Sequence, residues 1–185
     1  MRPNHNLPIQ ITIRELDQTN IEDANRCDGT FTVDGKLVLY AEGDVIRYTI
    51  SKIPPYQKRY DLDEFDLKSY ISNPERVIYI AYWEQQVAGQ IRLRRNWNGY
   101  AYVEDIVVDR NYRRRCVGLA ILAIAEAWAK AKQLPGVMLE TQNNNLAGCR
   151  LYESYGFKLL GFDNGLYRGI NPNTDEIALY WYLMI

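Results

Sequence analysis

The amino-acid sequence predicts an α+β fold with a mixed, mainly antiparallel twisted sheet that is flanked by helices. Segments 76–83, 86–95 and 99–109 are rich in β-branched and aromatic residues and follow one another across short turns, which is typical of an antiparallel meander. Helical periodicity appears only after this meander, and strands then alternate with helices. A run of strands followed by helices and further strands favours α+β over a purely parallel α/β sheet.

The segments before the meander are less regular. Residues 9–14 alternate between apolar and polar and predict an opening strand. Residues 28–40 predict two short strands around Asp34-Gly35, a dipeptide typical of hairpin turns. Pro54-Pro55 is expected to interrupt the next segment. Residues 61–72 predict a helix with acidic residues in its first turn, where the helix dipole favours them.

The segments after the meander predict two helices and three strands. The apolar positions of the first helix recur at spacings of four, three and four, at Val117, Ile121, Ile124 and Trp128. This helix is expected to end before the next Pro-Gly pair. Residues 137–141 predict a strand, and an asparagine run can cap a second helix over about residues 145–155. Residues 156–162 and 175–185 predict the last two strands.

The composition restricts the class of protein. The chain has 185 residues, of which 47% are hydrophobic, so we expect a single globular domain over residues 1–185 with residues 1–8 flexible. A net charge of -1 argues against nucleic-acid binding. The longest apolar run, Cys116–Ala125, is too short to span a membrane, which takes about 18 residues. The three cysteines form no CxxC pair and favour a reduced, cytoplasmic setting.

The single histidine excludes two kinds of site. His5 lies close to the N-terminus, where we expect the chain to fray. The sequence therefore predicts neither a Ser-His-Asp triad nor a histidine-rich metal site, and no metal is expected. Proton transfer would then use carboxylates, tyrosines, water or the backbone.

The segment 107–122, VVDRNYRRRCVGLAIL, combines a strand, a basic turn and the start of a helix. Backbone N–H groups at a helix N-terminus attract anions, and Gly118 would let a ligand approach the chain closely. Arg113, Arg114 and Arg115 add side chains that can grip phosphate oxygens bidentately. The segment therefore predicts a phosphate site, although a solvated basic turn remains the alternative.

Two motifs in this order resemble those of the GNAT superfamily of acyl-CoA-dependent N-acetyltransferases. The phosphate loop of that family, Q/R-x-x-G-x-G/A, corresponds to residues 113–118. Its later motif, N-x-x-A-x-x-L-Y-x-x-x-G-F, is matched by Asn145, Leu151-Tyr152 and Gly156-Phe157, with Gly148 in the alanine place. The expected element order also matches the family over residues 9–185. One departure is Cys116 at the first glycine of the loop, which would cost about 1 kcal/mol if φ must be positive there.

Further stretches are similar to streptothricin (nourseothricin) acetyltransferases. They are NWNGYAYVEDIVV at 96–108, LETQNNN at 139–145, and CDGTFTVD at 27–34. The resemblance implies transfer of an acetyl group from acetyl-CoA to an amine in the β-lysine part of a cationic antibiotic, giving resistance. The family often dimerises, so a homodimer is left open. The resemblance also leaves open which amine is acetylated.

The resemblance implies roles for three side chains in proton transfer and substrate binding. Glu104 would take the amine proton, through water, and Asp105 would bind a cationic group of the substrate. Because neighbouring strand residues face opposite sides, the two acids are not expected to share a role. The reverse assignment and two merely exposed acids remain alternatives. Tyr152 would protonate the leaving CoA sulfur, unless it is a core aromatic residue.

The resemblance also implies contacts with acetyl-CoA. The backbone of Val107 and Val108 would pair with the pantetheine arm, and Asn145 would hydrogen-bond it or act as a plain helix cap. The phosphates would lie against Arg113, Arg114, Arg115, Cys116, Val117, Gly118, Leu119 and Ala120.

Other residues are weaker candidates for binding the substrate. Trp97 would form an aromatic wall for a cation or anchor a turn, and Tyr167 is a substrate candidate by resemblance. A group of acids could attract a polycation or be a solvated helix start: Asp61, Asp63, Glu64 and Asp66.

Two other functions remain compatible with the sequence. The first is a GNAT enzyme that acetylates another amine or a protein N-terminus. The second is a non-catalytic acyl-CoA-binding module, for which Cys116 in the phosphate loop is the best argument. The presence of Glu104, Asp105 and Tyr152 favours an enzyme.

Overall fold

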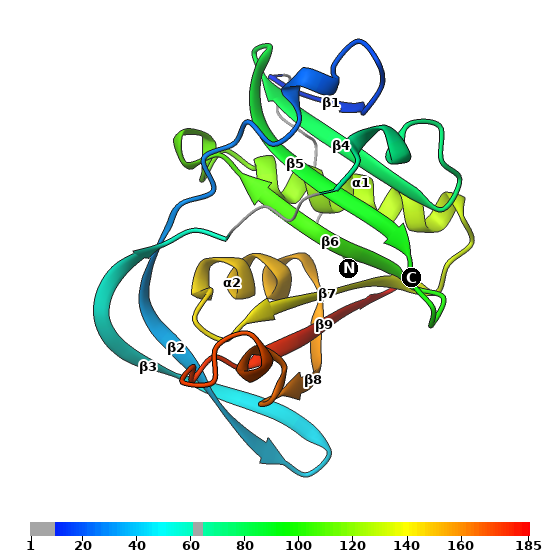
Figure 1. Cartoon of the computed structure of the whole chain (residues 1–185). Helices are drawn as coiled ribbons and strands as arrows, with labels where there is room; N and C mark the ends of the chain where they lie inside the picture. The colour runs from blue at the N-terminus through cyan, green and yellow to red at the C-terminus, as the bar shows by residue number, and fades with distance from the viewer. Residues whose placement is uncertain (1–9, 61–64) are drawn as a thin grey trace. The chain divides into compact units, whose positions relative to one another are not determined.

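The structure, a computed structural model, describes residues 10–60 and 65–185 (Figure 1). The chain divides into two compact units. The first unit comprises Met1–Thr30, Arg59–Val137 and Ile185, and the second comprises Phe31–Lys58 and Met138–Met184. The single domain expected over residues 1–185 stays a prediction. The expected flexibility of residues 1–8, His5, and the acids Asp61, Asp63 and Glu64 lie outside the described residues.

The first unit contains an antiparallel sheet with the strand order β1-β4-β5-β6. Its strands are β1 (Ile11–Glu15), β4 (Arg76–Trp83), β5 (Gln86–Arg95) and β6 (Ala101–Val108). The predicted opening strand and the predicted meander are therefore confirmed. Short connections join β4 to β5 and β5 to β6, as expected for strands that pair with their neighbours in sequence.

Helix α1 (Val117–Ala131) packs along one face of this sheet (Figure 1). Val117, Ile121 and Trp128, three of the four residues that predicted the helix, are buried. The helix comes closest to the sheet at Gly89 on β5. A Cβ atom there would lie 2.6 Å from Ile121 Cδ1 and 3.0 Å from the Val107 carbonyl oxygen. Glycine is therefore required where α1 and the sheet touch.

The opposite face of the sheet carries a second apolar layer. Its buried members are Leu16, Tyr70, Ile78, Ile80 and Tyr82. The alternation of β4 places its three members of this layer on one side of the strand. Phe65, Leu67 and Ile71 pack against the same layer and connect it to the segment before β4.

The helix predicted over residues 61–72 is wrong for the residues that the structure describes. Only a 3-10 turn, Leu67–Tyr70, forms there. The Asp66 carboxylate caps this turn by accepting a hydrogen bond from the Lys68 N–H at 2.9 Å. The chain is extended again at Ile71, whose N–H closes the turn by donating to the Lys68 carbonyl oxygen at 3.2 Å.

The second unit contains three strands in the order β7-β9-β8. They are β7 (Gly136–Gln142), β8 (Lys158–Asp163) and β9 (Ala178–Met184), and β8 pairs antiparallel with β9. Helix α2 (Leu146–Tyr155) packs its Tyr152 ring 6.0 Å from the ring of Phe157 and 6.3 Å from that of Trp181. These elements confirm the last three predicted strands and the second predicted helix.

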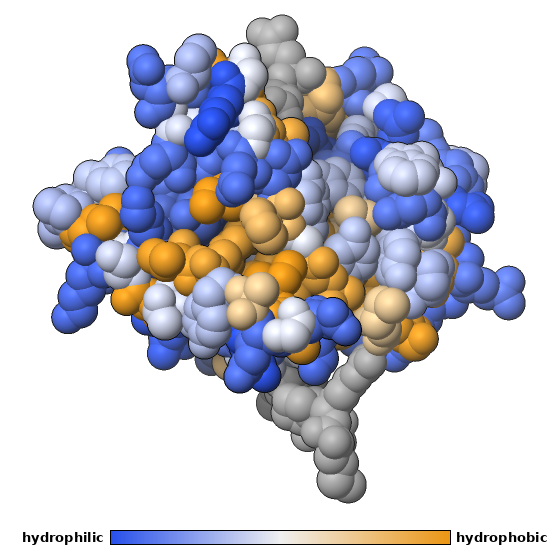
Figure 2. All heavy atoms as spheres, turned by 90° about the horizontal axis from the view of Figure 1, so that it is seen from below, coloured by the Kyte–Doolittle hydropathy of each residue, from blue (hydrophilic) through white to orange (hydrophobic). Residues whose placement is uncertain are grey.

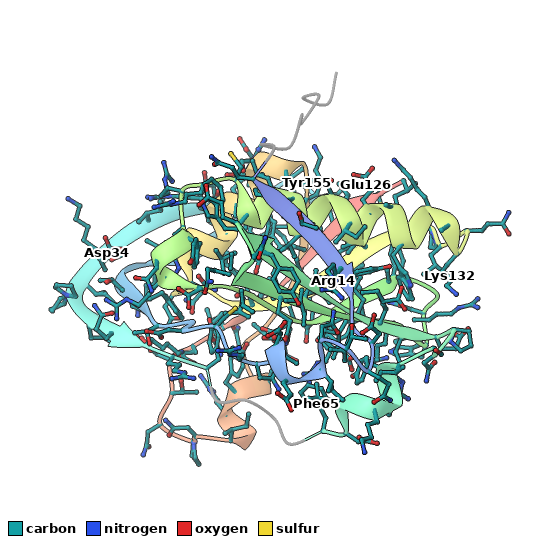
Figure 3. All side chains as sticks on the ribbon, turned by 90° about the horizontal axis from the view of Figure 1, so that it is seen from above. Arg14, Asp34, Phe65, Glu126, Lys132 and Tyr155 are labelled. Atoms are coloured by element: carbon teal, nitrogen blue, oxygen red, sulfur yellow. The ribbon has the colours of Figure 1, made fainter. Side chains whose placement is uncertain are left out.

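The second unit also contains a long hairpin that differs from the sequence prediction. Strands β2 (Phe31–Glu42) and β3 (Val45–Lys58) pair antiparallel, and the turn lies at Gly43-Asp44. The hairpin predicted at Asp34-Gly35 is wrong, since Asp34 lies within β2 (Figure 3). Gly35 serves close packing instead, because a Cβ atom there would lie 2.9 Å from the Ser51 carbonyl oxygen.

Pro54-Pro55 does not interrupt β3, contrary to expectation. The pairing register jumps from Val33 opposite Tyr56 to Gly35 opposite Lys52. The two prolines therefore lie in an irregular part of the ladder, where their missing N–H groups break no regular strand pairing.

Several apolar side chains of the hairpin reach the surface. Val38, Tyr40, Val45 and Ile50 are exposed. Figure 2 shows hydrophobic side chains gathered between hydrophilic ones on the face that it presents. Within residues 10–60 and 65–185, no helix has the length and apolar character needed to cross a membrane.

We expect the substitution Gly89→Ala to lower the free energy of unfolding by about 1–3 kcal/mol, because the added methyl group must displace Ile121 or the Val107 backbone. Urea unfolding followed by circular dichroism would measure this. Gly169→Ala is the matched control, since no atom lies within 4 Å of its Cβ position. Equal stability of Gly89→Ala and the wild type would contradict the packing described for α1.

Candidate active site

The predicted phosphate loop leads directly into α1. Cys116 is the N-cap residue of the helix, and no side chain caps this end. The first helical hydrogen bond runs from the Ala120 N–H to the Cys116 carbonyl oxygen at 3.0 Å. The N–H groups of Val117, Gly118 and Leu119 precede this bond and have no partner within the helix. The local geometry therefore suits an anion at the start of α1.

The three arginines of the loop have different surroundings. Arg113 donates hydrogen bonds to the carbonyl oxygens of Gly29, at 2.9 Å, and Val108, at 3.3 Å, and burial lowers the pKa of its guanidinium. The Arg115 guanidinium lies 5.1 Å from the centroid of the Trp83 ring. Arg114 and Arg115 are exposed. Arg113 thus ties the loop to the backbone, whereas the other two arginines are accessible to a ligand.

Cys116 adopts the left-handed conformation that its loop position requires, with φ of 62° and ψ of 6°. A residue with a Cβ atom is disfavoured in this conformation by about 1–2 kcal/mol. The departure from the family's glycine therefore lowers stability. The Cys116 thiol is exposed, whereas Cys27 and Cys149 are buried, and burial raises the pKa of each of these thiols to about 12.

Strand β6 contains a bulge at the two candidate acids. Asp105 pairs with Arg92, but the next pair is Val103 with Leu93, so that Glu104 is the extra residue. Val103 and Leu93 face the side of the sheet covered by α1. Alternation on each side of the bulge places both Glu104 and Asp105 on the opposite face. The expectation that the two acids face opposite sides is wrong, because the extra residue resets the alternation.

The Glu104 carboxylate is held by three side chains. The Tyr70 hydroxyl donates to its Oε2 at 2.6 Å, and Arg94 Nε donates to its Oε1 at 3.1 Å. Arg92 Nε lies 3.8 Å from Oε2. Burial and the neighbouring Glu104 raise the pKa of Tyr70 to about 12, so Tyr70 remains a donor at neutral pH. The result is a carboxylate of fixed orientation whose side chain is 20% exposed.

An aromatic ring fixes one of these arginines in turn. The Arg92 guanidinium lies 3.9 Å from the centroid of the Phe65 ring. Arg92 is buried, and this stacking shields its charge from water on one side. The segment before β4 therefore shapes the surroundings of Glu104 in two ways. Phe65 acts through Arg92, on which its ring stacks, and Tyr70 acts directly through its hydrogen bond to the carboxylate.

Asp105 has different neighbours from Glu104. Burial raises the pKa of the Cys27 thiol, and the negative charges of Asp109 and Asp105 raise it further. Cys27 belongs to the segment between the 3-10 turn Ile21–Asp23 and β2. The two acids thus share a face of the sheet but meet different parts of the first unit.

Asn145, a candidate in the second unit, acts as the N-cap of α2. Its Oδ1 accepts a hydrogen bond from the Gly148 N–H at 3.0 Å, and its Nδ2 donates to Thr141 Oγ1 at 3.2 Å. A Cβ atom at Gly148 would lie 2.8 Å from Asn145 Nδ2, so the cap side chain packs closely over the first turn of α2. The helix-cap alternative for Asn145 is therefore confirmed, and its contact with pantetheine stays a prediction.

Tyr152, Trp97 and Tyr167 lie in contrasting environments. Tyr152 is 4% exposed and belongs to the aromatic cluster of α2. Trp97 is 92% exposed in the turn between β5 and β6, so it does not pack under the hairpin as an anchor. The Tyr167 hydroxyl donates a hydrogen bond to Glu140 Oε1. The roles of these residues toward CoA and substrate stay predictions.

Four residues that sequence reasoning missed surround the candidates: Tyr70, Arg92, Arg94 and Glu140. The sequence could have indicated two of them. Arg92 and Arg94 alternate with apolar residues on β5, which predicts that both lie on the polar face of that strand. Tyr70 lies 34 positions from Glu104 and has no such signal. Within residues 10–60 and 65–185, no group of three or more His, Cys, Asp or Glu side chains could hold a metal ion.

We expect Cys116→Gly to raise the free energy of unfolding by up to about 1 kcal/mol, because glycine adopts a positive φ without steric cost. Thermal unfolding would report this as a higher Tm. Cys116→Ala keeps the Cβ atom and should bring no such gain. A gain from alanine equal to that from glycine would show that the thiol, and not the backbone, is responsible.

The sequence matches the model of the acetyltransferase (GNAT) family over residues 40–157. Streptothricin acetyltransferase A of Bacillus subtilis (strain 168) is 37% identical over 171 residues, which cover 92% of this chain and 98% of that protein. A streptothricin acetyltransferase of Escherichia coli is 36% identical over 130 residues, or 70% of this chain and 71% of that protein. The similarity thus extends over almost the whole chain.

Solved structures agree with these matches. A Bacillus anthracis protein assigned to the streptothricin acetyltransferases, crystallised in complex with acetyl coenzyme A, is 43% identical, with a TM-score of 0.86 over 95% of this chain and 97% of that one. Nourseothricin acetyltransferase is 28% identical, with a TM-score of 0.78 over 95% of this chain and 98% of that one. The predicted α+β fold class and the family resemblance are confirmed. The chain belongs to the acetyltransferase (GNAT) family and is an N-acetyltransferase.

Proposed function

We propose that this N-acetyltransferase moves an acetyl group from acetyl-CoA to a primary amine in the β-lysine part of streptothricin, and thereby confers resistance. The similarity to the Bacillus subtilis streptothricin acetyltransferase, over 98% of that enzyme's length, carries the proposal. The acetyl coenzyme A in the Bacillus anthracis structure supports the choice of acetyl donor. Strand β6 also presents two carboxylates, Glu104 and Asp105, on one face of the sheet. Arg92 and Arg94 already pair with Glu104, so Asp105 is the candidate for binding a cationic group.

The start of α1 fits the phosphates of the acetyl donor. No side chain caps this helix end, and Arg114 and Arg115 are exposed beside it. The N–H groups of the first turn would bind phosphate oxygens, and the two arginines would add charge-assisted hydrogen bonds. Val107 and Val108 pair with Gln90 and Gly89 of β5, and the pantetheine arm would hydrogen-bond those of their backbone groups that point away from β5. Bound acetyl-CoA supplies the thioester whose acetyl group is transferred.

Glu104 and Asp105 would prepare the acceptor amine. A lysine-like amine has a pKa near about 10.4 and must lose a proton before it attacks the thioester. Glu104 already accepts hydrogen bonds from Tyr70 and Arg94, and its remaining lone pairs would orient a water that takes this proton. Asp105 lies on the same face and would bind a second cationic group of the same substrate. The bulge thus permits both roles on one ligand.

Tyr152 would protonate the departing CoA thiolate. A simple thiol has a pKa near about 8.5, so a proton donor assists its departure. The rings of Phe157 and Trp181 lie against Tyr152 and would fix the direction of its hydroxyl. The aromatic cluster would then serve both packing and catalysis.

We place the enzyme in the cytoplasm, where acetyl-CoA is available and where its three free cysteines would stay reduced. A homodimer stays a prediction. The main rival to the antibiotic is a different amine acceptor, such as a polyamine or a protein N-terminus. The intact pair of acids on β6 argues against a module that binds acyl-CoA without turnover.

Thiol release from acetyl-CoA tests the proposal directly. The purified protein would be given acetyl-CoA with streptothricin and, separately, with spermidine, an aminoglycoside and a basic peptide. We expect rapid, saturable release with streptothricin alone. Release only with another amine would overturn the antibiotic substrate and keep the family.

Two variants test the proposed proton transfers. We expect Glu104→Gln and Tyr152→Phe each to lower kcat by about 10²-fold or more, because each removes one proton-transfer group and keeps the side-chain shape. Steady-state kinetics with streptothricin would measure this, with Glu75→Gln as the control at an exposed carboxylate. Near-normal turnover of either variant would remove that residue from the mechanism.

A further inference from the structure

Glu140 lies on the face of β7 that points away from α2. The neighbouring Thr141 points toward α2, since its hydroxyl accepts a hydrogen bond from the N-cap Asn145 at 3.2 Å. Strand alternation then places Glu140 and Gln142 together on the other face. The face of the second unit that α2 leaves uncovered thus carries a carboxylate from its first strand.

Strand β9 confirms this orientation. Trp181 packs against Tyr152 of α2, so Tyr180 and Tyr182 face the other side of β9. Tyr180 is close enough to Glu140 for the charge of Glu140 to affect it. Burial raises the pKa of the Tyr180 hydroxyl most, and the charges of Glu140 and Asp163 raise it further. Glu140 and Tyr180 therefore share one face of the second unit.

The Glu140 carboxylate is half-buried and has no cationic partner among the described residues. Its Oε1 accepts a hydrogen bond from Tyr167 of the 3-10 turn Leu166–Gly169. Its charged neighbour is another acid, Glu176, which is itself paired with Lys58. Burial and Glu176 raise the pKa of Glu140, and Tyr167 opposes this rise. The carboxylate is therefore partly desolvated without a compensating positive charge.

Two side-chain acceptors that follow Glu140 in the sequence are unsatisfied by the described residues. Asn144 is 6% exposed and donates through Nδ2 to Glu176 at 2.9 Å, yet its Oδ1 accepts no hydrogen bond from any described residue. Gln142 Oε1, on the same face of β7 as Glu140, is also buried without a donor. Buried acceptors without donors are rare in native proteins and call for an explanation. Both atoms are closed off from solvent, so an incoming ligand would meet the Glu140 carboxylate rather than these acceptors.

We infer that Glu140 is a specificity-determining residue that binds an ammonium group of a polycationic substrate, with Tyr167 as the residue that positions its carboxylate. An ammonium brings a positive charge and three donors to a half-buried carboxylate that has a tyrosine donor but no cationic partner among the described residues. This ammonium is distinct from the acetylated amine, which must be neutral when it attacks. The inference rests on the proposed function, since it assigns a binding group for the same substrate.

The charge of Glu140 gives this inference a distinctive signature in stability. A carboxylate retained for structure would stabilise the fold, whereas a desolvated carboxylate kept for a ligand destabilises the free protein. Glu140→Gln keeps the side-chain shape and an acceptor for Tyr167 but removes the charge. We therefore expect the variant to bind the substrate more weakly and to have a Tm equal to or above that of the wild type.

Isothermal titration calorimetry with streptothricin, and then with spermidine, would test the inference in the absence of acetyl-CoA. We expect Glu140→Gln to bind streptothricin at least about 10-fold more weakly than the wild type, and Tyr167→Phe to bind it more weakly by a smaller factor. In turnover, KM for streptothricin should rise while KM for acetyl-CoA stays unchanged. Glu153→Gln, at a carboxylate that accepts a hydrogen bond from Tyr48, is the matched control and should bind normally.

Three outcomes would overturn the inference: unchanged binding by Glu140→Gln, no binding of either polycation by the wild type, or a lower Tm of Glu140→Gln with unchanged binding by Tyr167→Phe. The release of CoA thiol, which reports acetyl transfer, is measured in a separate assay. If streptothricin binding depends on Glu140 but no acetyl group is transferred, the proposed function is wrong and the ammonium site is retained. The two claims therefore fail in distinguishable ways.

Discussion

The bulge at Glu104 is the constraint on which the first unit's chemistry depends. In a regular strand, one of two adjacent acids would point into the apolar layer beneath α1, where an unpaired carboxylate is strongly disfavoured. The extra residue opposite Arg92 lets Val103 keep its place in that layer while both acids face the other way. In this register Glu104 accepts hydrogen bonds from Tyr70 and Arg94.

The same pair of strands also sets the geometry of the phosphate loop. Strand β6 ends at Val108, Arg113 binds the Val108 carbonyl oxygen, and the chain turns through Cys116 into α1. Gly89 on β5 lets α1 lie directly against the sheet, so the start of the helix is fixed relative to the two acids on β6. The positive φ of Cys116 completes the turn at some loss of stability. The same packed core therefore positions both the pair of acids on β6 and the anion site at the start of α1.

Sequence reasoning succeeded where a local pattern decides the structure. The meander, the apolar face of α1 and the Asn145 cap each follow from spacing within one segment. It failed at the hairpin because both Asp34-Gly35 and Gly43-Asp44 are turn-forming pairs, and only packing around Gly35 distinguishes them. The bulge was invisible because it depends on how β6 pairs with β5.

The electrostatic partners were likewise beyond the reach of the sequence. Tyr70 and Glu104 are brought together by the path of the chain across the sheet. Glu140 stands inside a mostly apolar strand, where nothing local distinguishes a ligand-binding acid from an exposed one. Its proposed role rests on the hydrogen bond from Tyr167 and on the lack of a cationic partner among the described residues.

The central claim is that Glu104 and Asp105 act together on one substrate, and a double-mutant cycle tests it most directly. The cycle compares kcat/KM for streptothricin in the wild type, Glu104→Gln, Asp105→Asn and the double variant. If the bulge directs both acids to one ligand, their effects should be coupled by more than about 0.5 kcal/mol. Effects that add within about 0.3–0.5 kcal/mol would contradict the account and show that the two acids act independently.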